Sequence, residues 1–180
     1  IILDDDPTGT QTVVDITVLT DWSEELLMDE LIKTYPAFFI LTNSRSLVES
    51  EARKLGSELG ALIKGASQKT GVSTLIISRS DSTLRGHFPA EVDAVANAAG
   101  GTNLPYLIIP FFYEGGRFTV DDVHYVAEGE NLVPAALTPF ARDASFGFAH
   151  SNMKLWIEEK TKGTVTAENV VSVSLDDIRV

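Results

Sequence analysis

The sequence predicts an α/β protein with a mainly parallel, Rossmann-like sheet, helices on both faces and an inserted β-hairpin. Two observations lead to this class. Short apolar runs of strand length alternate along the chain with longer segments whose apolar residues recur at helical spacing. Such alternation favours parallel strands joined by right-handed helical crossovers. A chain of 180 residues can bury one substantial core, so we expect a single domain.

The first forty residues are expected to form three strands and one helix. Residues 1–3 are a short apolar run of strand length, and residues 16–19 are a second candidate. Ser23 is a suitable N-cap for a helix over residues 24–33, because its hydroxyl can accept a free backbone N–H at the helix start. The uninterrupted apolar run 37–41 then predicts a buried strand.

The middle of the chain repeats this alternation. Ser46 and Glu49 match a capping box, and a helical face of apolar residues follows as far as Ile63. Residues 74–77 form the next apolar run of strand length, and residues 90–95 lie in the next helix. The order of elements is therefore that of successive βα units.

The last third departs from this order. Residues 106–109 predict one more strand, and residues 118–126 predict a projecting β-hairpin whose turn is Asp121–Asp122. Residues 151–160 have the pattern of a final helix, and residues 170–173 that of a final strand. We expect the hairpin to form an arm that can cover a binding site.

The composition of the chain excludes several classes of binding partner. The formal net charge of −12 argues against nucleic acids and anionic membranes, since both require a basic surface. The chain has no cysteine, which excludes disulfides and thiolate metal sites, and no apolar run has the length of a transmembrane helix. We expect a cytoplasmic protein that holds any anionic ligand through local contacts. The chain also looks trimmed at both ends, since it lacks an initiator Met and stops within a helix start, so we expect a fragment of a longer protein.

A polar segment follows the apolar run 74–77 and is the most informative part of the chain. Residues 79–87 contain a carboxylate, three hydroxyls and two guanidinium groups, which together can hold a small polyhydroxy anion. In parallel sheets, ligands bind beyond the carboxyl ends of the strands. The alternative is a helix cap by Ser82 or Thr83, which would leave Asp81 and Arg85 without a purpose.

Two further strand ends carry polar groups. Residues 4–10 begin with three adjacent aspartates, whose mutual repulsion favours a functional reason such as a bound cation or a proton transfer. The alternative is an acidic turn, because Asp, Pro and Gly are frequent turn residues. Residues 42–45 follow the next strand, where the alternative is a helix cap by Ser44 or Ser46.

The positions of the arginines suggest a role in binding, whereas those of the histidines do not. Arginines lie at polar or glycine-containing junctions, which suits the recognition of an acid group by planar guanidinium forks; they are Arg45, Arg79, Arg85, Arg117 and Arg142. The histidines show no metal-ligand spacing, so we expect each in a loop or on the surface; they are His87, His124 and His150. No metal site is predicted from these residues.

Several of these motifs together resemble one family. Residues 5–9 (Asp-Asp-Pro-Thr-Gly), 81–86 (Asp-Ser-Thr-Leu-Arg-Gly) and 115–119 (Gly-Gly-Arg-Phe-Thr) are similar to motifs of the four-carbon acid sugar kinases, formerly a domain of unknown function. The likeness extends to residues 123–125 and 138–143. It implies ATP-dependent phosphorylation of a four-carbon sugar acid such as threonate, erythronate or a 3-oxo relative.

The resemblance also implies a domain organisation. Residues 1–180 correspond to the amino-terminal, substrate-binding domain of a two-domain kinase, and the carboxyl-terminal domain that binds ATP is absent from this chain. ATP and Mg²⁺ are then expected to be bound mainly by that missing domain. The sequence contains no glycine-rich phosphate loop of the common types, so we expect this fragment to bind its acid without turning it over.

Candidate roles follow from the needs of phosphoryl transfer, in which a carboxylate accepts the proton of the attacking hydroxyl. Asp6 or Asp81 can be this base, and Asp6 is the first choice. Arg85 and Arg117 are expected to clamp the substrate carboxylate. The remaining expected substrate contacts are Asp5, Thr8, Ser44, Arg45 and Ser82. The scheme requires Asp6 and Arg85 to converge on one ligand.

Two other functions are left open. Asp4 and Asp6 after an apolar strand also match the nucleophile and the acid/base of haloacid-dehalogenase-like phosphatases, although Gly9 stands where that motif has an apolar residue. A non-catalytic module that binds small acids is the other. In each case the expected partner is a small molecule, and a homodimer through the hairpin at Arg117 is a further open alternative.

Overall fold

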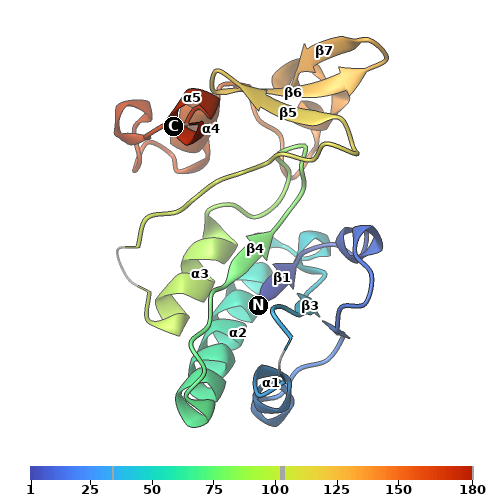
Figure 1. The fold of residues 1–180 in the computed structure, drawn as a ribbon. Helices are drawn as coiled ribbons and strands as arrows, with labels where there is room; N and C mark the ends of the chain where they lie inside the picture. The colour runs from blue at the N-terminus through green and yellow to red at the C-terminus, as the bar shows by residue number, and fades with distance from the viewer. Residues whose placement is uncertain (34, 102–103, 180) are drawn as a thin grey trace. The chain divides into compact units, whose positions relative to one another are not determined.

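The computed structural model describes residues 1–33, 35–101 and 104–179, apart from the side chains of residues 11 and 12 (Figure 1). The chain forms two compact units instead of the single one expected. The first unit comprises Ile1–Ser80 and Gly86–Tyr106, and the second comprises Asp81–Arg85 and Leu107–Val180. The second half of the chain builds an antiparallel sheet of its own, which is why one core does not serve the whole chain.

A parallel four-stranded sheet forms the centre of the first unit. Its strands are β1 (Ile2–Asp4), β2 (Val18–Leu19), β3 (Phe39–Leu41) and β4 (Ile77–Arg79), in the order β2-β3-β1-β4. The last residue of β1 pairs with the last residue of β3 on one side and of β4 on the other. The segments that follow these three strands therefore leave the sheet at one edge.

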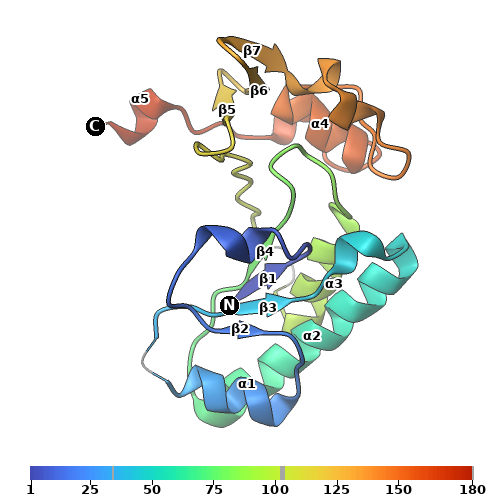
Figure 2. The same cartoon turned by 90° about the vertical axis from the view of Figure 1, so that its right-hand side faces the viewer.

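Helices α1 (Glu24–Leu31), α2 (Glu49–Thr70) and α3 (Ala90–Ala99) pack in one layer against this sheet (Figure 2). They share a core with the strands, made of Leu3, Leu27, Phe38, Ile40, Leu59, Ile63, Ala66 and Val95. The α/β class is thus confirmed, but the helices expected on both faces lie on one.

Strand order explains this placement. The crossovers from β2 to β3 and from β3 to β4 step in the same direction across the sheet, so right-handed connections put α1 and α2 on the same face. The step from β1 to β2 runs the other way. Its connection contains only a 3₁₀ turn, η1 (Gly9–Thr12), where a doubly wound fold would place a helix.

Local signals for helix starts were partly right. The Ser23 hydroxyl accepts the backbone N–H of Leu26 at 3.1 Å and so caps α1 as predicted. The capping box of Ser46 and Glu49 is wrong. Ser46 ends a 3₁₀ turn, η2 (Ser44–Ser46), and its hydroxyl donates to the carbonyl of Asn43 at 2.8 Å, so α2 begins after Val48 without a side-chain cap.

Three predicted strands differ in the structure. The run at 74–77 becomes a strand only from Ile77 onward, as β4. Residues 106–109 and 170–173 are not strands, and within the described part of the chain neither segment has a ladder partner. An apolar run forms a strand only when a neighbouring edge accepts its backbone hydrogen bonds.

An antiparallel sheet forms the first part of the second unit. The predicted hairpin is present as β5 (Arg117–Val120) and β6 (Val123–Glu128), and β7 (Asn131–Pro134) adds a third strand. The turn residues Asp121 and Asp122 both have positive φ, +48° and +65°. Aspartate tolerates this left-handed conformation, which two-residue hairpin turns require.

Short helices complete the second unit. The 3₁₀ turns η3 (Ala135–Leu137) and η4 (Pro139–Arg142) follow the sheet, and α4 (Met153–Lys160) buries Trp156 and Ile157 as predicted. A last 3₁₀ turn, η5 (Ala167–Asn169), precedes α5 (Leu175–Ile178), which starts at a capping box formed by Ser174. None of the helices in the described residues combines the length and the apolarity that crossing a bilayer requires.

Candidate functional site

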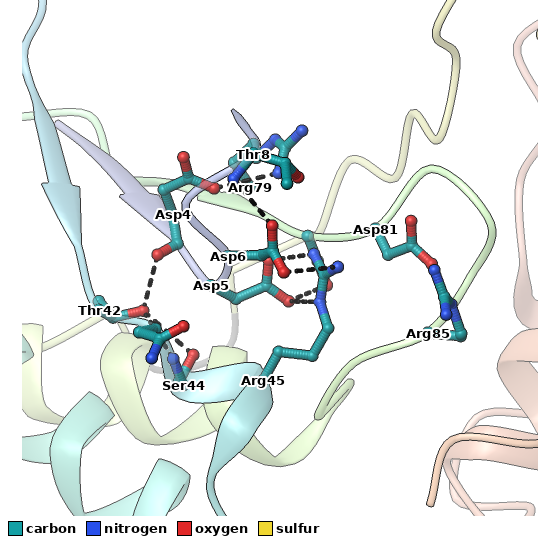
Figure 3. Close-up of polar contacts among 12 residues, drawn as sticks. Asp4, Asp5, Asp6, Thr8, Thr42, Ser44, Arg45, Arg79, Asp81 and Arg85 are labelled. Atoms are coloured by element: carbon teal, nitrogen blue, oxygen red, sulfur yellow. Dashed lines mark hydrogen bonds and ion pairs between the residues drawn. The ribbon is translucent and has the colours of Figure 1, made fainter. Parts of the chain in front are cut away.

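Asp5, just after β1, is the centre of a buried ion pair in the first unit (Figure 3). The Arg45 guanidinium donates from Nε to Asp5 Oδ2 at 3.0 Å and from Nη2 to Oδ1 at 2.5 Å. The Ser80 hydroxyl also donates to Oδ2, at 2.8 Å. Both carboxylate oxygens are therefore occupied, and with 3% exposure Asp5 holds three strand ends together. Its predicted contact with a substrate stays a prediction.

Asp4 ends β1 and is completely buried. The Arg79 guanidinium donates from Nη1 to Asp4 Oδ1 at 3.1 Å, while Oδ2 is buried without a hydrogen-bond partner among the described residues. Burial raises the pKa of Asp4 above its ordinary value, and the charge of Arg79 opposes this rise. Asp4 is a structural residue that solvent and ligands do not reach.

Asp6 is the exposed member of the three aspartates, with 27% of its side chain accessible. The backbone N–H of Thr8 donates to Asp6 Oδ1 at 2.8 Å, and Arg45 Nη1 lies 3.4 Å from Oδ2. Partial burial raises the pKa of Asp6, but the hydrogen bonds of Thr8 and the nearby guanidiniums outweigh it and hold the pKa below its ordinary value. Asp6 is thus ionised at neutral pH and can accept a proton.

Two motif glycines leave room for these ion pairs. A Cβ on Gly9 would lie 2.4 Å from Asp4 Oδ2 and 2.5 Å from the Arg79 guanidinium. Gly86 has a φ of +135°, and a Cβ there would lie 2.3 Å from the Ser80 hydroxyl. The last residues of the motifs 5–9 and 81–86 are therefore glycines for steric reasons.

We expect Gly86→Ala to lower the free energy of unfolding by about 3 kcal/mol, because backbone strain and the displaced Ser80 hydroxyl both act on the folded state. Gly71→Ala is the control. Gly71 also has a positive φ, +71°, but nothing lies within 4 Å of its added Cβ, so a loss of about 1 kcal/mol is expected. Urea denaturation measures both, and equal losses would contradict the steric role of Gly86.

Ser44 lies in the same unit but is buried completely. Its hydroxyl is 2.6 Å from Glu91 Oε1 and 3.1 Å from Thr42 Oγ1. Glu91 was not predicted as a functional residue. Its spacing of three and four residues from Ala94 and Val95 places it on the buried face of α3, which is the signal that could have identified it.

The loop 81–85, in the second unit, contains its own charged cluster. Arg85 Nε donates to Asp81 Oδ2 at 2.5 Å, and the Thr83 hydroxyl donates to the same oxygen. The Arg85 guanidinium lies 5.0 Å from the centroid of the Phe140 ring, and that of Arg117 lies 5.8 Å from it. The fold thus brings both candidate clamp residues to one aromatic ring.

Two more observations define this cluster. Arg117 Nε is buried and has no hydrogen-bond partner among the described residues. Asp143 Oδ2 lies 3.9 Å from Arg85 Nη1, and backbone N–H groups of Phe146 and Ser145 hold the pKa of Asp143 below its ordinary value. The cluster therefore combines the guanidiniums of Arg85 and Arg117 with the carboxylates of Asp81 and Asp143, and the buried Nε of Arg117 has no acceptor among the described residues.

His124 fixes the conformation of the loop 81–85. It is fully buried, so the expectation that it lies in a loop or on the surface is wrong. Its Nε2 is 2.7 Å from the Ser82 carbonyl and its Nδ1 is 2.9 Å from the Thr119 hydroxyl. Burial lowers its pKa, so the neutral ring donates from Nε2 and accepts at Nδ1. The alternation of His124 with buried Val126 along β6 was the available signal.

The remaining predicted site residues, Thr8 and Ser82, lie outside the side-chain ion pairs described above. Thr8 is exposed, and Ser82 contributes its carbonyl oxygen to His124. The alternative role of Ser82 or Thr83 as a helix cap is excluded, since the N-cap of α3 is Pro89 and has no side-chain bond. The predicted convergence of Asp6 with Arg85 joins residues of two separate units and stays a prediction.

A parallel sheet with charged side chains gathered after its strands defines a ligand-binding α/β domain. Residues 1–179 match the model of the sugar-binding N-terminal domain family, and the chain belongs to this family. The resemblance noted from the motifs is thereby confirmed. A comparison with curated proteins found no match.

Two solved structures that this chain resembles are described as members of the family of unknown function DUF1537. A protein of Bordetella bronchiseptica, a domain-swapped dimer with bound citrate, is 25% identical over 87% of this chain and 38% of its own, with a TM-score of 0.62. A Haemophilus influenzae protein of that family is 15% identical over 88% of this chain and 38% of its own, with a TM-score of 0.58.

A third structure, from Salmonella typhimurium and provisionally described as a tRNA synthase, is 17% identical over 88% of this chain and 37% of its own, with a TM-score of 0.56. The last two similarities demonstrate the fold alone. The chain spans less than two fifths of the solved proteins that it matches.

Proposed function

We propose that this chain is the acid-sugar-binding domain of an ATP-dependent kinase that phosphorylates a four-carbon sugar acid of the threonate, erythronate or 3-oxo-tetronate type. Membership of a sugar-binding family supports a carbohydrate ligand. The related Bordetella protein was solved with citrate, a small hydroxy acid, which supports an acidic one. The observation that carries the proposal is the pair of guanidiniums, Arg85 and Arg117, at the Phe140 ring.

This pair is suited to a carboxylate. Cation–π contact with Phe140 orients both guanidinium planes, and a planar fork binds the two oxygens of a carboxylate together. The buried Nε of Arg117 is a donor that still needs an acceptor. In a chain with a net charge of −12, an anion has to be held by local contacts such as these, because the overall charge repels it.

Asp6 is the proposed base. Its carboxylate is ionised and more exposed than those of Asp4 and Asp5, whereas Asp81 already accepts bonds from Thr83 and Arg85 at one oxygen. We propose that Asp6 accepts the proton of the attacking sugar hydroxyl. Asp5 and Arg45 then act as positioning residues for Asp6, because their fork fixes the segment that follows β1.

ATP and Mg²⁺ are assigned to the carboxyl-terminal domain of the proposed two-domain kinase. When bound, Mg²⁺ would neutralise charge on the transferred phosphoryl group. The three consecutive aspartates 4–6 do not fit a metal site, because Arg79 is paired with Asp4 and Arg45 is shared between Asp5 and Asp6. No cluster of metal-ligating side chains occurs elsewhere in residues 1–33, 35–101 and 104–179. No step is therefore derived through a metal here.

Calorimetric titration with D-threonate, D-erythronate and ATP tests the binding proposal. We expect one acid to bind and ATP not to bind. Arg85→Ala should weaken the acid about 10- to 100-fold, the effect of losing one or two charged hydrogen bonds. Arg142→Ala, an exposed arginine of η4, is the matched control and should leave the affinity unchanged. Equal affinities of the two variants would remove Arg85 from the site.

Activity measurements distinguish the kinase from the two alternative functions, a non-catalytic module and a phosphatase. If the intact protein binds a tetronate but consumes no ATP, the non-catalytic module is favoured. Release of phosphate from a phosphate ester by this chain would favour the phosphatase. The complete burial of Asp4 against Arg79 opposes that role, since a nucleophile must reach phosphorus. Association of two copies, as in the dimeric Bordetella protein, is proposed on that precedent and is measured by light scattering.

A further inference from the structure

Three successive hydrogen bonds link α3 to the end of β1 inside the first unit. Glu91 Oε1 lies 2.6 Å from the Ser44 hydroxyl oxygen, which lies 3.1 Å from the Thr42 hydroxyl oxygen. The Thr42 hydroxyl donates to the carbonyl of Asp4 at 2.9 Å. All four residues are buried, so water does not complete the arrangement.

The number of available hydrogens favours a neutral Glu91 over an ionised one. A carbonyl oxygen only accepts, so the Thr42 hydrogen is committed to Asp4. Ser44 has one hydrogen for its two contacts. If Glu91 were ionised, that hydrogen would go to the carboxylate and the Ser44–Thr42 contact would have none. A neutral Glu91 supplies the missing hydrogen, and the bonds then run in one direction from Glu91 through Ser44 and Thr42 to Asp4.

The surroundings of Glu91 favour the same state. Asp5 places a negative charge nearby from the end of β1, while the positive charge of Arg45 in η2 is shared with Asp5 and Asp6. On α2, the residue that packs closely against Glu91 is Gly56, which carries no charge. The His87 carbonyl accepts the backbone N–H of Glu91, and the His87 ring nitrogen Nε2 lies 3.0 Å from the Leu47 carbonyl oxygen. Burial, the largest effect, raises the pKa of Glu91 to about 7, although the Ser44 hydrogen bond and the Arg45 charge both act to lower it.

We infer that Glu91 is held as a neutral carboxylic acid and serves as a positioning residue, which fixes η2 through Ser44 and thereby sets the Arg45 guanidinium on Asp5 and Asp6. Ser44 and Arg45 are consecutive residues of η2, so a shift of one moves the other. The structural part of this inference stands by itself, and its effect on acid binding rests on the proposed function.

A dependence on pH follows. Because the pKa of Glu91 is higher in the folded chain than its ordinary value near 4.5, the folded state holds this proton more tightly than the unfolded state. The stabilisation is complete below the ordinary pKa, decreases as pH rises toward about 7, and is absent above it. The chain should therefore lose stability across this interval.

Glu91→Gln tests the inference, because its amide donates to Ser44 at every pH. Urea denaturation between about pH 5 and pH 8 should show a decline for the wild type that is much smaller for Glu91→Gln. Glu51→Gln removes the same charge from an exposed first-turn position of α2 and should decline like the wild type. If Glu91→Gln declines in parallel with the wild type, the inference is overturned.

Carbon-13 NMR of the glutamate carboxyl groups gives a second measurement that needs no variant to fold. The Glu91 resonance should titrate near neutral pH, and a midpoint at the ordinary value near 4.5 would overturn the inference. If the acid titration described above shows no binding by the wild type, the proposed function fails while the Glu91 midpoint still decides this inference. The two failures are thus distinguishable.

Discussion

Replacement of Arg45 by alanine is expected to lower the free energy of unfolding by about 3–5 kcal/mol, the effect of removing one partner of a buried ion pair. Asp5 is 3% exposed and receives both prongs of the Arg45 fork. Without the guanidinium, the Asp5 carboxylate would remain buried between two other aspartates, and among the described residues the Ser80 hydroxyl would be its remaining side-chain donor. The cost of burying this unpaired charge therefore falls on the folded state and lowers its stability.

The control is Arg53→Ala. Arg53 forms an exposed pair with Glu49 at 3.6 Å on α2, and such pairs contribute about 1 kcal/mol or less. Arg45→Lys keeps the charge but cannot form the fork, so an intermediate loss is expected. Urea denaturation at neutral pH measures all three variants. A loss for Arg45→Ala no larger than that for Arg53→Ala would show that the buried pair contributes little.

In the proposed two-domain kinase, Asp6→Asn is expected to reduce kcat about 10²- to 10⁴-fold, the usual contribution of a general base. The asparagine oxygen can still accept the Thr8 N–H, so the loop is retained, but the amide cannot take a proton. KM for the sugar acid should change little, because the lost interaction belongs to the transition state. Steady-state kinetics with ATP and the acid measure both constants.

Two further variants test whether Asp6 itself is the general base. Asp15→Asn changes an exposed aspartate in the same β1–β2 connection and should leave kcat unchanged. Asp81→Asn examines the other candidate base. If Asp81→Asn lowers kcat by the larger factor while Asp6→Asn retains activity, the two aspartates exchange the roles proposed for them.

Most features that depend on neighbouring residues were predicted correctly, although the capping box of Ser46 and Glu49 was not. The cap at Ser23 and the hairpin turn at Asp121–Asp122 are formed by side chains and backbone groups within a few residues. Features that need a distant partner were not. The apolar runs 106–109 and 170–173 resemble strands but have no paired edge in the described part of the chain, and apolarity alone does not provide one.

The sequence by itself determined the α/β class, the motifs that follow the strands and the family, because these depend on residue types and short spacings. Only the tertiary structure decided which of three consecutive aspartates is exposed. Arg45 and Arg79 reach Asp5 and Asp4 from 40 and 75 residues away and leave Asp6 accessible. A carboxylate's charge and access depend on such distant partners and on burial, which adjacent positions in a chain do not reveal.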